Sequence, residues 1–161
     1  EQIVMELRKE FLEVEDRIPG AGSLEKIENY SEWLEKVIKD LKPETVPEGR
    51  VPSTQYLTFR KSDDRLVGMI QLRNELNDYL LKFGGHIGDC IRPTERNKGY
   101  ATEQIAIVLK ECEKLKINKG LITCKDWNLA SAKTIIKNGG VLENEIADEN
   151  GVMVKRFWIT L

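Results

Sequence analysis

The residues with the clearest chemical potential lie in the segment 90–102, where a strand-like pattern gives way to a short polar loop and then to an amphipathic helix. The first N–H groups of a helix have no partner within the helix, and the helix macrodipole is positive at that end. Gly99 and the small Ala101 let a phosphate approach the backbone closely, while Arg96 and Lys98 add positive charge. This order of residue types predicts a binding site for a phosphate-bearing anion.

Residue spacing separates this loop from two common nucleotide-binding motifs. The chain has no G-x-x-x-x-G-K-S/T sequence, and no G-x-G-x-x-G follows the strand directly. It does contain Arg96-x-x-Gly99-x-Ala101, and in this feature it resembles the GNAT superfamily of N-acetyltransferases. In that family a Q/R-x-x-G-x-G/A loop between a strand and a long helix binds the pyrophosphate of acetyl-CoA through backbone N–H groups.

The segments around the loop extend the resemblance over about residues 53–159. GNAT proteins commonly carry a Pro shortly before the motif, as Pro93 does here, and a later helix that opens on Asn with a small residue three positions on, as Asn128 and Ser131 do. The resemblance implies acetyl-CoA as co-substrate, no metal, and a coenzyme site made of Ile91, Arg92, Arg96, Asn97, Lys98, Gly99, Tyr100, Ala101, Thr102, Asn128 and Ser131.

The same residues also have a purely structural explanation. The loop would be an ordinary helix start if Thr94 were the N-cap and if Arg96 and Lys98 were solvated charges. Asn128 is itself a residue type that commonly caps helices. In the family the equivalent Asn contacts the coenzyme as well, so the two roles of Asn128 are compatible.

Family membership implies direct attack of an amine on the thioester, and this attack requires a proton acceptor. An alkylamine with a pKa of about 10.4 is mostly protonated at neutral pH. His86, the only histidine, has a suitable ordinary pKa of about 6.5, but it is also explained as a hydrogen-bonded structural residue. Asp89, on the opposite side of the same strand, is the rival acceptor. A bulge in the strand 85–91 would expose a backbone N–H for the oxyanion.

The proton donor for the departing thiolate is missing from its expected place. Many GNAT enzymes have a Tyr seven positions after the helix-opening Asn, and this chain has Ile135 there. A thiol with a pKa of about 8.5 leaves tolerably as a thiolate near neutral pH. Two hypotheses therefore stand: an active N-acetyltransferase acting on a small-molecule or protein amine, and a non-catalytic acyl-CoA-binding or regulatory module.

The elements that must position this loop follow from hydrophobic periodicity and turn residues. We expect a helix at 99–116, a strand at 120–124, a helix at 128–138, and strands at 141–146 and 152–159. A strand, helix, strand order calls for a right-handed crossover and a parallel strand pair. Upstream we expect a hairpin of strands 55–60 and 65–73, joined by a polar turn at 61–64, and a third strand at 86–92.

Two amphipathic helices precede the strands. The first carries Val4, Leu7, Phe11 and Val14, and the second carries Ile27, Tyr30, Leu34, Val37, Ile38 and Leu41. The polar connection 74–82 has fewer family constraints, and we expect Arg73 and Asn77 to contact the acceptor substrate. Trp33, Trp127 and Trp158 are interpreted as packing residues.

Length and charge bound the remaining possibilities. With 161 residues and 40% hydrophobic content, the chain fits one domain over 1–161, with a helical substrate-side region at 1–52 and a coenzyme-binding core at 53–159. The predicted fold is α/β (α+β), a GNAT-like mixed, mostly antiparallel sheet with a central parallel pair, flanked by helices. A formal net charge of −2 favours neither nucleic acid nor membrane as a partner. We expect a cytoplasmic protein with three reduced cysteines, and the family resemblance is compatible with a homodimer.

Overall fold

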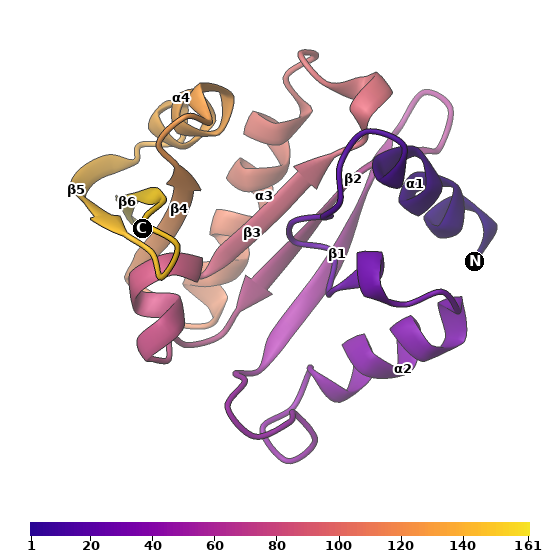
Figure 1. Ribbon diagram of the computed structural model, residues 1–161, viewed down its shortest axis with the longest axis horizontal. Coiled ribbons are helices and arrows are strands. Elements are labelled where there is room, and N and C mark those ends of the chain that lie inside the picture. The colour runs from indigo at the N-terminus through magenta and orange to yellow at the C-terminus, as the bar shows by residue number, and fades with distance from the viewer.

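Six strands form one mixed sheet in the order β1-β2-β3-β4-β6-β5 in the computed structural model, which describes residues 1–161 (Figure 1). The strands are β1 (Ser53–Arg60), β2 (Arg65–Arg73), β3 (Ile87–Ile91), β4 (Lys119–Lys125), β5 (Val141–Ala147) and β6 (Met153–Thr160). Every neighbouring pair is antiparallel except β3 and β4. The predicted fold class, a mostly antiparallel sheet with a central parallel pair, is confirmed.

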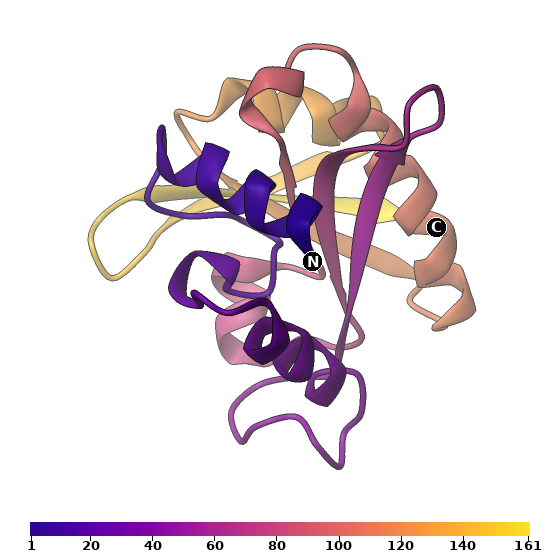
Figure 2. The same cartoon turned by 90° about the vertical axis from the view of Figure 1, so that its right-hand side faces the viewer.

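Helices cover both faces of this sheet. They are α1 (Gln2–Leu12), α2 (Tyr30–Lys39), α3 (Tyr100–Lys114) and α4 (Leu129–Lys137), with short helical turns η1 (Leu24–Lys26), η2 (Leu80–Gly84) and η3 (Pro93–Glu95). Figure 2 shows α1 and α2 on one face and α3 and α4 on the other. Each face has its own apolar core, one gathered around α1 and α2 and one around α3 and α4.

The helices form where apolar residues recur every three or four positions. In α1 the buried residues are Val4, Leu7 and Phe11, as the sequence predicts, whereas Val14 lies beyond the end of the helix and is exposed. In α3 the apolar stripe that includes Ile105 and Cys112 packs on the sheet. Burial of such a stripe stabilises a helix far more than its intrinsic propensity does.

The predicted apolar side of the second helix is correct only in part. Val37 is buried, and Ile27 and Tyr30 pack against the core. Leu34, Ile38 and Leu41 are exposed, and Trp33 is buried instead. Trp33 fixes this orientation because its indole N–H donates to the carbonyl of Ala21 at 2.8 Å. A large side chain with a buried hydrogen bond outweighs several aliphatic residues that pack at the rim.

The connection from β2 to β3 is more ordered than a polar loop. Residues 80–84 form the π-type turn η2, in which Leu80 is buried. The Asn77 side-chain oxygen accepts the Leu80 N–H at 2.9 Å and starts the turn. A single turn is too short to show helical periodicity in the sequence. None of the helices combines the length and the apolar character that crossing a bilayer requires.

Candidate active site

The sheet opens between its two parallel strands. β3 stays in register with β2 along its whole length, but it pairs with β4 only at Ile87 and Ile122. The N–H of Arg92 donates to the carbonyl of Val67 at 2.8 Å, and ladder hydrogen bonds alternate along an antiparallel pair. The backbone N–H groups of Asp89 and Ile91 therefore point toward β4, where the two strands are no longer paired.

The expected bulge in the strand 85–91 does not occur. The register between β2 and β3 is continuous, and the irregular positions of the sheet lie between β1 and β2 and between β5 and β6. The separation of β3 from β4 frees backbone N–H groups without a bulge. This separation depends on how two strands about 30 residues apart diverge in space, so local sequence does not encode it.

Asp89 lies beside this opening, on the face of the sheet that α3 covers. Its Oδ2 accepts a hydrogen bond from Gln104 Nε2 of α3 at 3.0 Å. Burial raises the pKa of Asp89 to about 6, and the hydrogen bond from Gln104 opposes that rise. A carboxylate with such a pKa is mostly ionised at neutral pH and is still basic enough to accept a proton.

His86 links the start of β3 to β4, next to the one position at which these two strands are paired. The ring Nδ1 of His86 accepts the backbone N–H of Leu121 at 3.0 Å, and the backbone N–H of His86 donates to the Leu121 carbonyl at 2.7 Å. Burial, together with the nearby charge of Arg73, lowers the pKa of His86 to about 4. The ring nitrogen that lacks a proton already has a donor, so this geometry favours the structural explanation of His86 over the role of base.

The loop before α3 presents unpartnered backbone donors. Asn97 and Gly99 adopt left-handed conformations with φ of 64° and 90°, and Gly99 stands at the N-cap position without a side-chain cap. The first intrahelical bond runs from the Glu103 N–H to the Gly99 carbonyl at 3.2 Å. No acceptor in the chain bonds the N–H groups of residues 100–102. These are the donors that an anion at a helix N-terminus binds.

Thr94 is not the N-cap of this helix, so that structural explanation of the loop is wrong. Thr94 lies in η3, and its backbone N–H and hydroxyl both donate to Oε1 of Glu10, at 2.8 Å and 2.7 Å. The cap position falls to Gly99 because η3 and the following turn move the start of α3 five residues further along the chain.

The two loop cations are already paired with acids. Arg96 Nη2 lies 2.6 Å from Glu15 Oε1, and its guanidinium stacks 5.5 Å from the centre of the Phe11 ring. Lys98 Nζ lies 2.8 Å from Glu95 Oε2. The positive charge expected from these side chains is therefore largely compensated, and the anion-binding character of the loop rests on its backbone.

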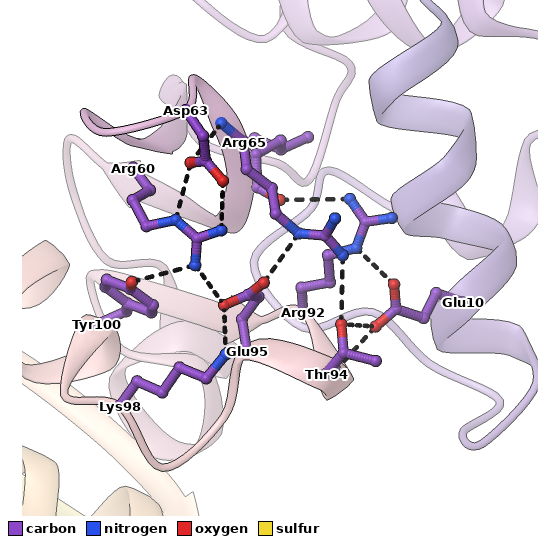
Figure 3. A network of polar contacts seen from close by, with 10 residues as sticks. Glu10, Arg60, Asp63, Arg65, Arg92, Thr94, Glu95, Lys98 and Tyr100 are labelled. Atoms are coloured by element: carbon purple, nitrogen blue, oxygen red, sulfur yellow. Dashed lines mark hydrogen bonds and ion pairs between the residues drawn. The ribbon is translucent and has the colours of Figure 1, made fainter.

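A polar network fastens the loop to the rest of the molecule (Figure 3). Glu95 is almost fully buried and pairs with Arg60 and Arg65 as well as with Lys98, each at 2.8 Å. The hydrogen bond from Lys98 and the charges of the two arginines lower the pKa of Glu95. One carboxylate thus ties the loop to the hairpin of β1 and β2.

A second carboxylate, Glu10 of α1, secures the other end of the loop. Besides Thr94 it binds Arg92, whose Nε lies 2.5 Å from Glu10 Oε2 (Figure 3). Arg92 was predicted to bind the coenzyme, but its side chain is buried in this ion pair. Sequence reasoning missed Glu10 and Glu95, because their partners lie on other elements and leave no pattern in the local sequence.

The opening of α4 flanks the site from the other strand. Asn128 is the N-cap of α4, and its side-chain oxygen accepts the Ser131 N–H at 3.1 Å. It follows the C-terminal end of β4, just as the loop 92–99 follows the C-terminal end of the parallel strand β3. Ile135 is fully buried in the core, so no proton donor stands at that position.

Arg73 and Asn77, the predicted acceptor contacts, line one cavity of about 280 Å³ on the face of α1 and α2. No group of three or more His, Cys, Asp or Glu side chains has a metal-binding arrangement. Cys90, Cys112 and Cys124 are free and buried.

The family model described as an acetyltransferase (GNAT) domain matches residues 10–141. The chain belongs to the GNAT acetyltransferase family. It is thus an acetyl-CoA-dependent N-acetyltransferase, and acetyl-CoA is the co-substrate that its family uses. The match reaches further toward the N-terminus than the motif-based resemblance and includes α2 and the end of α1.

Solved structures agree with this assignment at the level of the fold. A spermidine N-acetyltransferase from Vibrio cholerae is similar with a TM-score of 0.62 and 20% identity, over 83% of this chain and 76% of the other. A GNAT family acetyltransferase from Bacillus anthracis has a TM-score of 0.55 and 23% identity, over 66% and 65%. A ribosomal-protein-S5-alanine acetyltransferase from Vibrio fischeri has a TM-score of 0.55 and 17% identity, over 67% and 61%. The comparison with curated proteins gives no match.

Proposed function

We propose that this GNAT enzyme transfers an acetyl group from acetyl-CoA to a primary amine while both substrates are bound, with Asp89 as the proton acceptor. The observation that carries the proposal is the opening between β3 and β4. Asp89 lies on β3 beside this opening, and the loop that leads to the N-terminus of α3 follows the same strand, so a coenzyme bound along β3 would reach from an anion-binding backbone to a basic carboxylate. Neither feature alone would support transfer.

The coenzyme site rests on main-chain donors. The unpartnered N–H groups of residues 100–102 would hold the pyrophosphate, and the left-handed Gly99 leaves room for it, because no atom lies within 4 Å of the place where a Cβ would stand. The backbone of Asp89 and Ile91, which faces β4, would bind the amide groups of the pantetheine arm in the way a neighbouring strand would. Asn128 and Ser131 would close the site from the side of β4.

The chemical step needs three contributions from the chain. Asp89 accepts a proton from the ammonium form of the acceptor, directly or through one water, and so frees the nitrogen lone pair. The amine nitrogen attacks the thioester carbon, and a backbone N–H in the opening stabilises the oxyanion. The carbonyl then re-forms as the carbon–sulfur bond breaks, CoA departs as a thiolate without help from Ile135, and the nitrogen releases its second proton to water to give the neutral amide.

The helical region 1–52 forms the acceptor side in this proposal. The loop between α1 and α2 crosses β3, where an added Cβ on Gly20 would meet the Gly88 carbonyl oxygen at 2.1 Å. Such close approach of two backbones brings the first third of the chain against the middle of β3, next to Asp89. An acceptor held by this region would meet the thioester through the gap in the sheet.

The test is release of free thiol from acetyl-CoA across a panel of primary amines, with the acetylated product identified by mass. We expect transfer to at least one amine, and loss of transfer but not of CoA binding in Asp89→Asn. The buried Ile135 favours one alternative, a module that binds acyl-CoA without transfer. Tight CoA binding with no product from any amine would support that alternative.

A further inference from the structure

The cavity on the face of α1 and α2 is polar, and the part of the sheet that lines it belongs to β1 and β2. Ser53 and Gln71 lie in its wall, and both are buried. Arg73 reaches over Gly88, since a Cβ added to Gly88 would stand 3.1 Å from Arg73 Nη2. The guanidinium therefore lies one residue along the strand from Asp89, on the opposite face of the sheet.

Arg73 has no acidic partner. Its Nη1 donates to the carbonyls of Gly84 and Gly85 at 2.9 Å and 3.0 Å, and its Nη2 lies 3.4 Å from the Gln71 side-chain oxygen. Burial lowers the pKa of Arg73 to about 10, which reflects a cation without a counter-charge. Charged groups that lose water without a partner are costly, and proteins usually pair them. The second edge of this guanidinium has only one long contact and is available to a ligand.

The rest of the cavity adds to the positive charge. Arg17 and Arg50 also line it, and Glu25 is the only acid that does. Arg17 makes no ion pair or hydrogen bond within the chain, and Arg50 is 3.3 Å from Asp40, which it shares with Lys36. One carboxylate oxygen of Glu25 is buried without a donor. The cavity thus offers an excess of guanidinium groups and one unpaired acceptor.

We propose that the acceptor is a small amine that carries a carboxylate or a phosphate, and that Arg73 binds this anionic group. The inference rests on the proposed function, because it takes the cavity to be the acceptor site. Guanidinium recognises both anions by paired N–H donors, and a cavity of about 280 Å³ suits a small molecule. Glu25 is the only carboxylate in the cavity that could pair with the ammonium group of such an amine. A polyamine would instead bring several ammonium groups against three arginines.

Binding measurements test this independently of turnover. The probes are two matched pairs, alanine against alaninamide and glucosamine 6-phosphate against glucosamine, with spermidine as a polycation. Each is titrated calorimetrically into the protein saturated with CoA, and acetyl transfer to each is measured in parallel. We expect at least one anionic member to bind about tenfold or more tightly than its neutral partner, and spermidine to bind more weakly than that member.

Variants locate the effect. Arg73→Gln should abolish the preference for the anionic member, and Arg73→Lys should restore part of it. Arg17→Gln should reduce the preference by a few-fold without affecting the fold, because Arg17 is exposed and makes no hydrogen bond or ion pair. Lys110→Gln, a charge change on the exposed side of α3, is the matched control and should leave it unchanged.

The outcomes separate this inference from the proposed function. A preference for an anionic amine that depends on Arg73 supports the inference, even if no amine is acetylated. The absence of acetylation would contradict only the proposed transfer. Equal or tighter binding of the neutral members or of spermidine overturns the inference, even if acetylation is efficient. A preference that survives Arg73→Gln also overturns it.

Discussion

Replacing Asp89 by Asn should make the protein more stable and less active at the same time. Asn resembles the protonated form of Asp89, and its side-chain oxygen can still accept the hydrogen bond from Gln104. It removes the cost of holding a negative charge beside the β3–β4 opening. A residue that lowers stability where it stands is typical of a functional site.

The magnitude follows from the pKa. Burial raises the pKa of Asp89 from 3.8 to about 6, and one pKa unit corresponds to about 1.4 kcal/mol. Well below pH 3.8 the carboxyl is protonated in both the folded and the unfolded chain, so it costs nothing. As the pH rises to about 6 the unfolded chain loses this proton first, and the folded state is penalised. Above that pH the penalty is constant, at about 2 to 3 kcal/mol.

Urea unfolding of Asp89→Asn and the natural protein at several pH values measures this difference. We expect the variant to be more stable by about 2 to 3 kcal/mol at pH 7.5, with the gap closing toward pH 4. Asp64→Asn is the control, because Asp64 is exposed in the hairpin turn at a φ of 53° that Asn also tolerates. A variant of equal or lower stability at pH 7.5 would falsify the argument from burial.

The same variant tests the chemistry. Loss of a general base typically lowers the rate by about 10² to 10⁴, so Asp89→Asn should retain acetyl-CoA binding and lose turnover by a factor in that range. In the natural enzyme kcat/KM should rise with pH through about 6 as Asp89 ionises. Undiminished turnover in the variant, with an unchanged pH profile, would assign the proton transfer to another group.

Three further predictions concern the loop and its supports. Gly99→Ala and Gly151→Ala both place a side chain at a positive φ, and each should lose about 1 to 2 kcal/mol of stability. Only Gly99→Ala should weaken CoA binding in a calorimetric titration. Equal CoA affinities of the two variants would contradict the assignment of the loop. His86→Ala leaves the Leu121 N–H unpaired and should cost about 1 to 3 kcal/mol in urea unfolding. The rise of kcat/KM near pH 6 should persist in that variant, because the pKa of His86 is already lowered to about 4, and disappearance of the rise would make His86 the base. Burial would raise the pKa of Glu10, but hydrogen bonds from Thr94 and Arg92 lower it overall. Glu10→Gln should therefore destabilise the protein at pH 7. It should also raise the KM for acetyl-CoA, because Glu10 secures the loop before α3. That stability difference should shrink as the pH falls below the ordinary value of 4.5, and a difference independent of pH would exclude the ion pair as its source.

The sequence by itself determined which segments are helices and strands, because these depend on neighbours within a few residues. The apolar stripe of α1, the hairpin turn at 61–64 and the Asn128 cap are local features, and each was predicted. The motif Arg96-x-x-Gly99-x-Ala101 likewise lies in one continuous segment, so its resemblance to the GNAT loop was visible without a structure. The family comparison agrees with that prediction.

Only the tertiary structure decided what surrounds those residues. His86 and its rival Asp89 were both candidates for the base in the sequence, but His86 receives a backbone donor from β4, whereas Asp89 is half-buried beside α3. The sequence predicts that Arg96 binds phosphate, but in the fold Arg96 pairs with Glu15, which comes from a distant part of the chain. The protonation state of a side chain is set by burial and by charges that arrive from distant parts of the chain, and these have no periodicity in the sequence. For the same reason the loss of pairing between β3 and β4 beyond Ile87 exists only once both strands are in place.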